Sequence, residues 1–354
     1  MKIVVLCGGL SSERDVSLST AALSAAALRR LGHDVTCVDL FLGVVEPTAT
    51  VAEDAPNLDE LRALRDDDSH IGDGVFELCQ GADLVFMALH GADGEDGKIQ
   101  AALDLLGVKY TGSGSFGSAL AMNKAVAKTL LSAGGVRVAK GTTLRFAHEA
   151  TENDFVTGKP AGDYGYCGKV PYYGELDIMP PYVVKPCSGG SSVGTAIVFD
   201  LFDTEAALAA AFAVEDTVLV EEYIAGRECD VGVIAGRALP PIEIATGEGF
   251  YDYKSKYQAG IAVETCPADL PQETTDALKA AALAVFELLH LEVYARMDFI
   301  VAEDGEVFCL EANTLPGLTP TSLMPQEAAA EGLSFDELIA LIVSESLKKY
   351  GTAR

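Results

Sequence analysis

The chain has 354 residues and carries 53 acidic against 25 basic side chains, a formal net charge of −28. A surface this negative repels nucleic acid and anionic membranes, so we expect neither as a partner. The length favours more than one domain, and a hydrophobic content of 49% is that of a globular protein.

Eight cysteines are spread along the chain without a CxxC pair, and several stand in apolar runs such as 4–7 and 308–310. This distribution indicates free thiols in a reducing compartment, with neither disulfides nor a zinc cluster. The first apolar run is too short for a signal peptide, and the longest apolar stretch, 277–293, is interrupted by Lys279 and Glu287. We therefore expect a buried helix there and a cytoplasmic protein.

Strands and helices alternate in the first part of the chain. The expected elements are strands 2–7, 34–39 and 84–89 and helices 15–31 and 96–106. Strands separated by helices predict a doubly wound parallel sheet. Residues 42–75 are acidic and contain proline, with a short helix expected at 58–66.

Two further units are expected after residue 122. The second unit, 123–221, should hold helices 123–133 and 204–213, the latter capped by Asp203, and strands 181–185, 195–199 and 217–221. The third unit, 222–354, should hold strands 228–235 and 240–245, helix 271–289, a hairpin, and helix 335–349 with a capping box of Ser334 and Glu337.

The hairpin of the third unit is expected from two runs of alternating side chains, 294–301 and 307–313. Asp304 and Gly305 stand between them, and Asp-Gly is a strong signal for a two-residue turn. Such a turn fixes which residues of the two strands face each other.

In that register Asp298 lies opposite Glu311 and Arg296 lies opposite Asn313, and alternation places Cys309 on the same face. Two facing carboxylates repel each other unless a cation lies between them. Oxygen ligands of this kind suit Mg²⁺ or Mn²⁺, which in such sites hold nucleotide phosphates. The alternative is a solvated hairpin face, and a register slip of one residue would remove the site.

A glycine- and serine-rich loop, 186–194, follows Lys185 at the end of a strand. Small residues allow backbone amides to approach an anion, so this loop is expected to cover a phosphate. It also matches GxSxG, with Ser192 as the nucleophile of an esterase. That motif must lead into a helix, whereas 195–199 predicts a strand, and neither GxGxxG nor GxxxxGK[ST] occurs. Phosphate binding is therefore favoured over ester hydrolysis.

Together these stretches resemble the D-alanine–D-alanine ligase family of ATP-grasp enzymes, over residues 1 to about 347. The motifs that carry the resemblance are 12–18, 90–97, 110–114, 122–124, 185–194, 221–228, 251–257, 296–298 and 310–317. The family implies an α/β protein of three subdomains. These are an N-terminal Rossmann-like domain (1–122) and two α+β lobes (123–221 and 222–354) that enclose ATP.

The resemblance also implies the reaction and its ligands. The carboxylate of one D-alanine attacks the γ-phosphate of ATP, and the amine of a second D-amino acid then displaces phosphate from the acylphosphate, giving D-alanyl-D-alanine for peptidoglycan. Two Mg²⁺ (or Mn²⁺) ions and a homodimer are further implications. The implied metal ligands are Asp298, Glu311 and Asn313, and the implied ATP contacts are Lys124, Lys185, Ser192, Glu221, Tyr223, Ile224, Glu228 and Lys256.

For the amino-acid substrates the resemblance implies a second group of residues. Glu13 would pair with the ammonium of the first D-alanine, in a trio with Ser191 and Tyr257, and His90, otherwise a structural residue, would lie near its carboxylate. Arg296 and the amide of Gly317 would stabilise the oxyanion, and Ser322 and Leu323 would bind the carboxylate of the second substrate.

Some features depart from the family or leave a choice open. Residues 42–75 and 153–181 are longer than the usual connections, and Glu222 stands where some members have Lys. Tyr257 favours an amine acceptor, with D-serine and D-lactate as alternatives to D-alanine. A non-catalytic ATP-binding scaffold is the alternative from another class.

Overall fold

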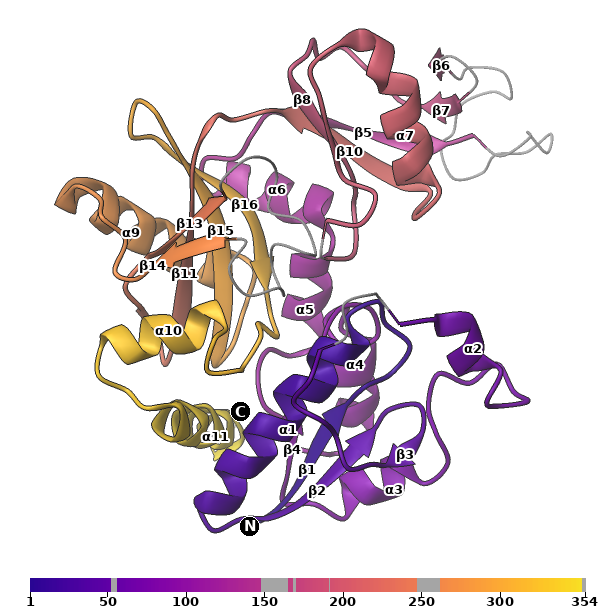
Figure 1. The fold of residues 1–354 in the computed structure, drawn as a ribbon, viewed down its shortest axis with the longest axis vertical. Coiled ribbons are helices and arrows are strands. Elements are labelled where there is room, and N and C mark those ends of the chain that lie inside the picture. Colours follow the sequence, from indigo (N-terminus) through magenta and orange to yellow (C-terminus); the bar gives the residue numbers. More distant parts are fainter. Residues whose placement is uncertain (52–55, 148–164, 168–169, 191, 247–261, 352–354) are drawn as a thin grey trace.

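The computed structural model describes residues 1–51, 56–147, 165–167, 170–190, 192–246 and 262–351, which form three sheets with helices packed on them (Figure 1). Within those ranges, none of the helices has the length and apolar character that crossing a membrane requires.

The first sheet is mainly parallel, as predicted. β1 (Lys2–Cys7) lies in its middle and runs parallel to β2 (Asp34–Asp39) and to β4 (Leu84–Met87), and the short β3 (Gly43–Val44) adds an antiparallel edge. The helices of this part are α1 (Arg14–Arg30), α2 (Leu58–Arg62), α3 (Val75–Gln80) and α4 (Lys98–Leu105). β3 and α3 were not predicted, because two to six residues show no clear periodicity.

The second sheet is antiparallel, in the order β6-β7-β5-β10-β8-β9. Its strands are β5 (Gly141–Phe146), β6 (Gly165–Cys167), β7 (Val170–Tyr173), β8 (Tyr182–Pro186), β9 (Ala196–Val198) and β10 (Thr217–Glu222). Helix α7 (Thr204–Phe212) covers one face of this sheet, with Leu208 and Ala211 packed against Val184 and Val218.

The predicted cap of α7 is wrong. The side chain of Asp203 makes no cap hydrogen bond in the described structure, because a short 3₁₀ turn, η1 (Leu201–Asp203), precedes the helix. Asp200 begins that turn instead, and its carboxylate accepts a hydrogen bond from the backbone N–H of Phe202 at 3.0 Å.

The third sheet is also antiparallel, in the order β14-β13-β11-β15-β16, with β12 beside β11. Its strands are β11 (Gly226–Ile234), β12 (Arg237–Ala238), β13 (Ile242–Thr246), β14 (Ala262–Thr265), β15 (Tyr294–Ala302) and β16 (Val307–Asn313). The helices α5 (Ser115–Met122), α6 (Lys124–Ala133) and α9 (Gln272–Leu288) share its core. Ala127 and Leu131 of α6 thus pack with the third sheet, while the unit boundaries at residues 122 and 221 remain predictions.

The last two helices lead back toward the first sheet. α10 (Leu323–Ala330) is followed by α11 (Phe335–Gly351), which lies beside α1 near both chain ends (Figure 1). Ile339 and Ile342 of α11 belong to the same core as the strands of the first sheet. The predicted capping box is confirmed: Ser334 Oγ accepts from the Glu337 N–H at 3.3 Å, and Glu337 Oε2 accepts from the Ser334 N–H at 2.8 Å.

Candidate active site

The hairpin of β15 and β16 has the predicted pairing at the candidate metal ligands: Asp298 faces Glu311 and Arg296 faces Asn313. The predicted two-residue turn is nevertheless wrong. Ala302 and Glu306 close the loop, since the Ala302 N–H donates to the Glu306 carbonyl at 2.9 Å. The loop is therefore one residue longer, with Gly305 in the left-handed conformation that such loops require (φ 85°).

A β-bulge compensates for the longer loop. The register shifts between Asp298 and Phe299, so that Phe299 pairs with Cys309 and the pairing skips Leu310. The bulge turns Leu310 toward the cleft beside Glu311. Cys309, predicted on the same face as Glu311, instead lies in the core of the third sheet, because the extra residue reverses the alternation.

A cavity of about 560 Å³ lies between the second and third sheets. Its polar lining comes from the ends of strands and from the glycine-rich loop. The described lining residues predicted from the sequence are Lys124, Lys185, Ser192, Glu221, Tyr223, Ile224, Glu228, Asp298 and Glu311. The structure therefore brings together, in one cleft, residues that are separated by up to 187 positions in the chain.

A buried triad forms one wall of this cleft. Glu221, only 2% exposed, lies 2.5 Å from the Nζ of Lys185 and 2.5 Å from the Nζ of Lys128. Burial alone would raise the pKa of Glu221, but the two lysines outweigh it and lower that pKa. Burial, helped by the charge of Lys185, lowers the pKa of Lys128. Lys128 was not predicted, although its position one helical turn after Lys124 could have suggested it.

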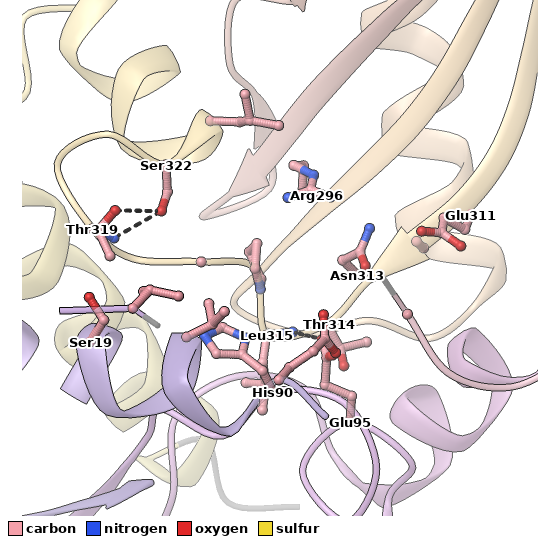
Figure 2. A pocket seen from close by; sticks show the side chains of 18 of the residues that line it. Ser19, His90, Glu95, Arg296, Glu311, Asn313, Thr314, Leu315, Thr319 and Ser322 are labelled. Atoms are coloured by element: carbon pink, nitrogen blue, oxygen red, sulfur yellow. Dashed lines mark hydrogen bonds between the residues drawn. The ribbon is translucent and has the colours of Figure 1, made fainter. Parts of the chain in front are cut away.

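A second cavity, of about 470 Å³, adjoins the first (Figure 2). Among the residues predicted for the amino-acid substrates, it is lined by Glu13, His90, Arg296, Gly317, Ser322 and Leu323. The two cavities have Lys124, Gly189, Gly190 and Glu311 in common. They are therefore contiguous, and Glu311 lies at their junction.

Opposite charges are paired at this junction. Arg296 donates from Nε to Asp298 Oδ1 at 2.8 Å and from Nη2 to Oδ2 at 2.9 Å, while Asn313 Nδ2 donates to the same Oδ2 at 2.9 Å. Lys124 Nζ lies 3.2 Å from Glu311 Oε2. Within the described ranges, no group of three or more His, Cys, Asp or Glu side chains could hold a metal ion. The oxygen donors that the described residues offer at this place are the carboxylates of Asp298 and Glu311 and the amide of Asn313.

His90 lies at the base of the second cavity, its Nε2 3.0 Å from the hydroxyl of Thr20. Burial lowers the pKa of His90, and the carboxylate of Glu13 opposes this effect. Nearby, Glu95 accepts hydrogen bonds from the N–H of Gly91 at 3.0 Å and of Leu315 at 2.8 Å.

Glu95 was not predicted as a site residue, although it stands in the acidic stretch that follows His90. Burial raises the pKa of Glu95 to about 8, with a further contribution from the charge of Glu13. Its two backbone contacts tie the loop after β4 to the segment after β16, so it supports the cavity that His90 lines.

The N-terminus of α10 opens on the second cavity. Ser322 precedes the helix, and its Oγ accepts from the Thr319 N–H at 3.1 Å and lies 2.8 Å from the Thr319 hydroxyl (Figure 2). Backbone N–H groups at such a position attract carboxylates. A Cβ on Gly317 would come within 2.9 Å of Ser322 Oγ, so a glycine is needed for this close approach.

Three predicted residues, Ser191, Lys256 and Tyr257, lie outside the described residues. The GxSxG stretch leads through a turn into β9, not into a helix, so the esterase alternative has lost its structural basis. The sequence did not assign Ala49 and Val51, which line the second cavity from the long 42–75 segment.

An α/β domain followed by two antiparallel lobes, with a cleft of buried lysines and glutamates between the lobes, defines an ATP-grasp protein. Family models described as the D-ala D-ala ligase N-terminus and C-terminus match residues 2–113 and 174–344. The chain belongs to the D-alanine–D-alanine ligase family.

Known relatives agree with this assignment over nearly the full length. The D-alanine–D-alanine ligase of Pediococcus pentosaceus is 39% identical, covering 99% of both chains, and that of Nitratidesulfovibrio vulgaris is 41% identical, covering 99% of this chain and all of the relative. The crystal structure of the Bacillus anthracis D-alanine–D-alanine ligase complexed with ATP aligns with a TM-score of 0.74 at 28% identity, over 99% of each chain.

Proposed function

We propose that this protein joins two D-alanines in an ATP-dependent reaction that passes through D-alanyl phosphate and releases ADP and phosphate. The observation that carries the proposal is the junction of the two cavities at Lys124, Gly189, Gly190 and Glu311. A carboxylate held in the smaller cavity can there reach the terminal phosphate of a nucleotide held in the larger one. The family and its named ligases support the same reaction.

The larger cavity is the proposed nucleotide site. Glu221 would accept from the adenine amino group, and the backbone at Tyr223 and Ile224 would flank the ring. Glu228 would bind the ribose. The remaining proposed contacts, to the phosphates, are Lys124, Lys185, Ser192 and Lys256, the last of which lies outside the described residues. The buried lysines suit this role because a phosphate chain brings several negative charges into a site of low dielectric.

Asp298, Glu311 and Asn313 are proposed to hold Mg²⁺ or Mn²⁺. Glu311 lines both cavities, Asp298 the larger one and Asn313 the smaller one, and hard oxygen donors of this kind suit these ions. Each carboxylate has a cation beside it in the structure, Arg296 for Asp298 and Lys124 for Glu311. When bound, the divalent ions would neutralise phosphate charge.

The smaller cavity is the proposed site of both D-alanines. Glu13, with Ser191 and Tyr257, would bind the first ammonium group, and His90 would lie near the carboxylate that becomes phosphorylated. Ser322 and Leu323, at the N-terminus of α10, would bind the carboxylate of the second.

The second step begins when the amine nitrogen of the second D-alanine attacks the acyl carbon. The carbonyl oxygen becomes an oxyanion, to which Arg296 and the N–H of Gly317 would donate, and phosphate then leaves as the C–O bond breaks. Exclusion of water from the smaller cavity would protect the acylphosphate from hydrolysis.

The test is a product assay with purified protein, ATP and Mg²⁺. Phosphate release is expected only when ATP, Mg²⁺ and D-alanine are all present, and mass spectrometry should find D-alanyl-D-alanine. The same assay with an equimolar mixture of D-alanine, D-serine and D-lactate shows, from the products found, which acceptor is preferred. Phosphate release that does not depend on D-alanine would refute the proposal. Full turnover by Glu311→Gln would exclude this carboxylate from the chemistry, and ATP binding without any dipeptide would favour a non-catalytic ATP-binding scaffold.

The proposal includes a homodimer in the cytoplasm, where ATP is available. Sedimentation of the purified protein at micromolar concentration tests the dimer. A monomer that keeps full activity would remove it from the proposal.

A further inference from the structure

We infer that Asp230 positions Arg296 for the second chemical step, an inference that rests on the proposed function. Asp230 lies on β11, opposite Asp298 of β15, and Gly232 lies opposite Arg296. The four positions therefore share one face of the third sheet. Asp230 Oδ2 lies 2.9 Å from Arg296 Nε, almost as close as the Oδ1 of Asp298 at 2.8 Å.

Asp230 differs from Asp298 in its surroundings. It is 1% exposed and is not among the described residues that line either cavity, whereas Arg296 lines the smaller cavity and Asp298 the larger one. Within the described part of the chain, the second oxygen of Asp230, Oδ1, has no hydrogen-bond partner. Burial, helped by the charge of Asp298, raises the pKa of Asp230 well above its usual range, and the contact with Arg296 opposes this effect.

This arrangement separates two tasks. Asp298 is proposed to hold a divalent cation, and in the present structure both of its oxygens contact Arg296. A carboxylate that turns toward a metal ion can no longer hold a guanidinium with both oxygens. Asp230 lines neither cavity among the described residues, so it can keep Arg296 in place while Asp298 binds the divalent cation. The contact between Arg296 and Asp230 is therefore kept when Asp298 turns toward the metal ion.

Loss of Asp230 is expected to affect mainly the second step, in which the amine attacks D-alanyl phosphate. Formation of D-alanyl phosphate breaks the bond between the β-γ bridging oxygen and the γ-phosphorus, and the proposed role of Arg296 does not begin until the amine attacks. Loss of Asp230 should therefore slow the second step more than the first. A merely structural role would impair both steps together.

The experiment compares two rates for Asp230→Asn, which keeps the shape of the side chain and replaces its carboxyl group by an amide. Overall turnover should fall about 10- to 100-fold, the range for residues that orient a reacting group. Movement of ¹⁸O from the β-γ bridge of labelled ATP into the non-bridging β positions, which reports reversible D-alanyl phosphate formation, should stay within about twofold of wild type. Asp230→Ser repeats the measurement if the asparagine variant does not fold.

Two controls make the test specific. Glu327→Gln removes another fully buried carboxylate, one that accepts from the Gly232 N–H at 2.8 Å, and should leave the ratio of exchange to turnover unchanged. Adding Asp230→Asn to Arg296→Ala should produce no further loss, since the first residue acts through the second. Equal loss of both rates, or full additivity with Arg296→Ala, would overturn the inference. If the wild-type protein forms no dipeptide, the proposed function fails instead.

Discussion

Arg296 lies between two carboxylates, so its guanidinium is held in place before any substrate arrives. Asp298 was predictable as a neighbour, because both residues stand on one short strand. Asp230 was not, because it lies 66 positions earlier, and only the pairing of β11 with β15 brings it near. The contact between Lys128 and Glu221 was likewise not predicted, because it depends on long-range packing that local sequence patterns do not reveal.

Replacing Arg296 by Ala should lower turnover at least ~100-fold, the loss that follows removal of one oxyanion donor. Arg296→Lys keeps the charge but loses the planar fork, and should recover little of the rate. Steady-state kinetics with saturating ATP and D-alanine measure both variants. A near-normal rate for the alanine variant would exclude Arg296 from the chemistry.

Glu95 should make stability depend on pH. Burial raises its pKa from 4.5 to about 8 in the folded protein, so the folded state holds the proton more tightly than the unfolded chain does. This contribution is complete below pH 4.5 and is lost as the pH rises through about 8. Melting temperatures measured across this range should fall less in Glu95→Gln than in the wild type.

The exposed loop residue Glu303 offers a matched control, since Glu303→Gln also removes one carboxylate. It should reproduce the wild-type dependence of melting temperature on pH. Identical profiles for all three proteins would show that Glu95 does not take up a proton in this range.

The hairpin of β15 and β16 shows which features the alternation of side chains in the sequence can predict and which it cannot. Alternation gave the correct facing residues near Arg296, although the loop and the strand each contain one residue more than the simplest hairpin. The two additions cancel beyond Leu310, so the prediction was right at the site and wrong at the turn. The long helices were predicted from their periodicity, whereas β3, β12 and α3 were too short to show any.

Deleting Leu310 should remove the bulge without changing the pairing at the site, because Glu311 would then follow Cys309 directly and still lie opposite Asp298 on the cleft face. ATP binding in the presence of Mg²⁺, measured by calorimetry, should be weaker than in the wild type, since Leu310 lines the larger cavity, but should be kept, and the far-ultraviolet circular dichroism should remain that of a folded protein.

Leu310→Ala is the control for this deletion, because it keeps the number of residues and therefore the bulge. It should bind ATP more weakly than wild type, since Leu310 lines the larger cavity, but should still bind it. Loss of ATP binding in the deletion variant, but not in Leu310→Ala, would contradict this expectation and show that the bulge itself sets the direction of Glu311.

The whole molecule is joined by α11, which begins after the third sheet and ends beside the first (Figure 1). The sequence predicted the helix and its capping box, but an apolar face does not say which core it will cover. Ile339 and Ile342 pack into the core that contains β1 and β4. The first sheet therefore depends on residues more than two hundred positions away.

Ile342→Ala should lower the free energy of unfolding by about 2–5 kcal/mol, because it leaves a cavity in this core. Urea denaturation followed by circular dichroism measures the change. Leu105→Ala serves as the control, since Leu105 is 91% exposed on α4, and should be nearly neutral. A similar small effect of both variants would show that α11 contributes little to the first core.

The position of α11 also bears on how the protein matures during translation. The ribosome makes β1 before the second and third sheets and α11 after them, yet β1 and α11 meet in one core. While the nascent chain is still growing, the apolar surface that α11 will cover stays open to water. A stalled or prematurely ended translation product would expose that surface and should be a preferred client of chaperones and proteases.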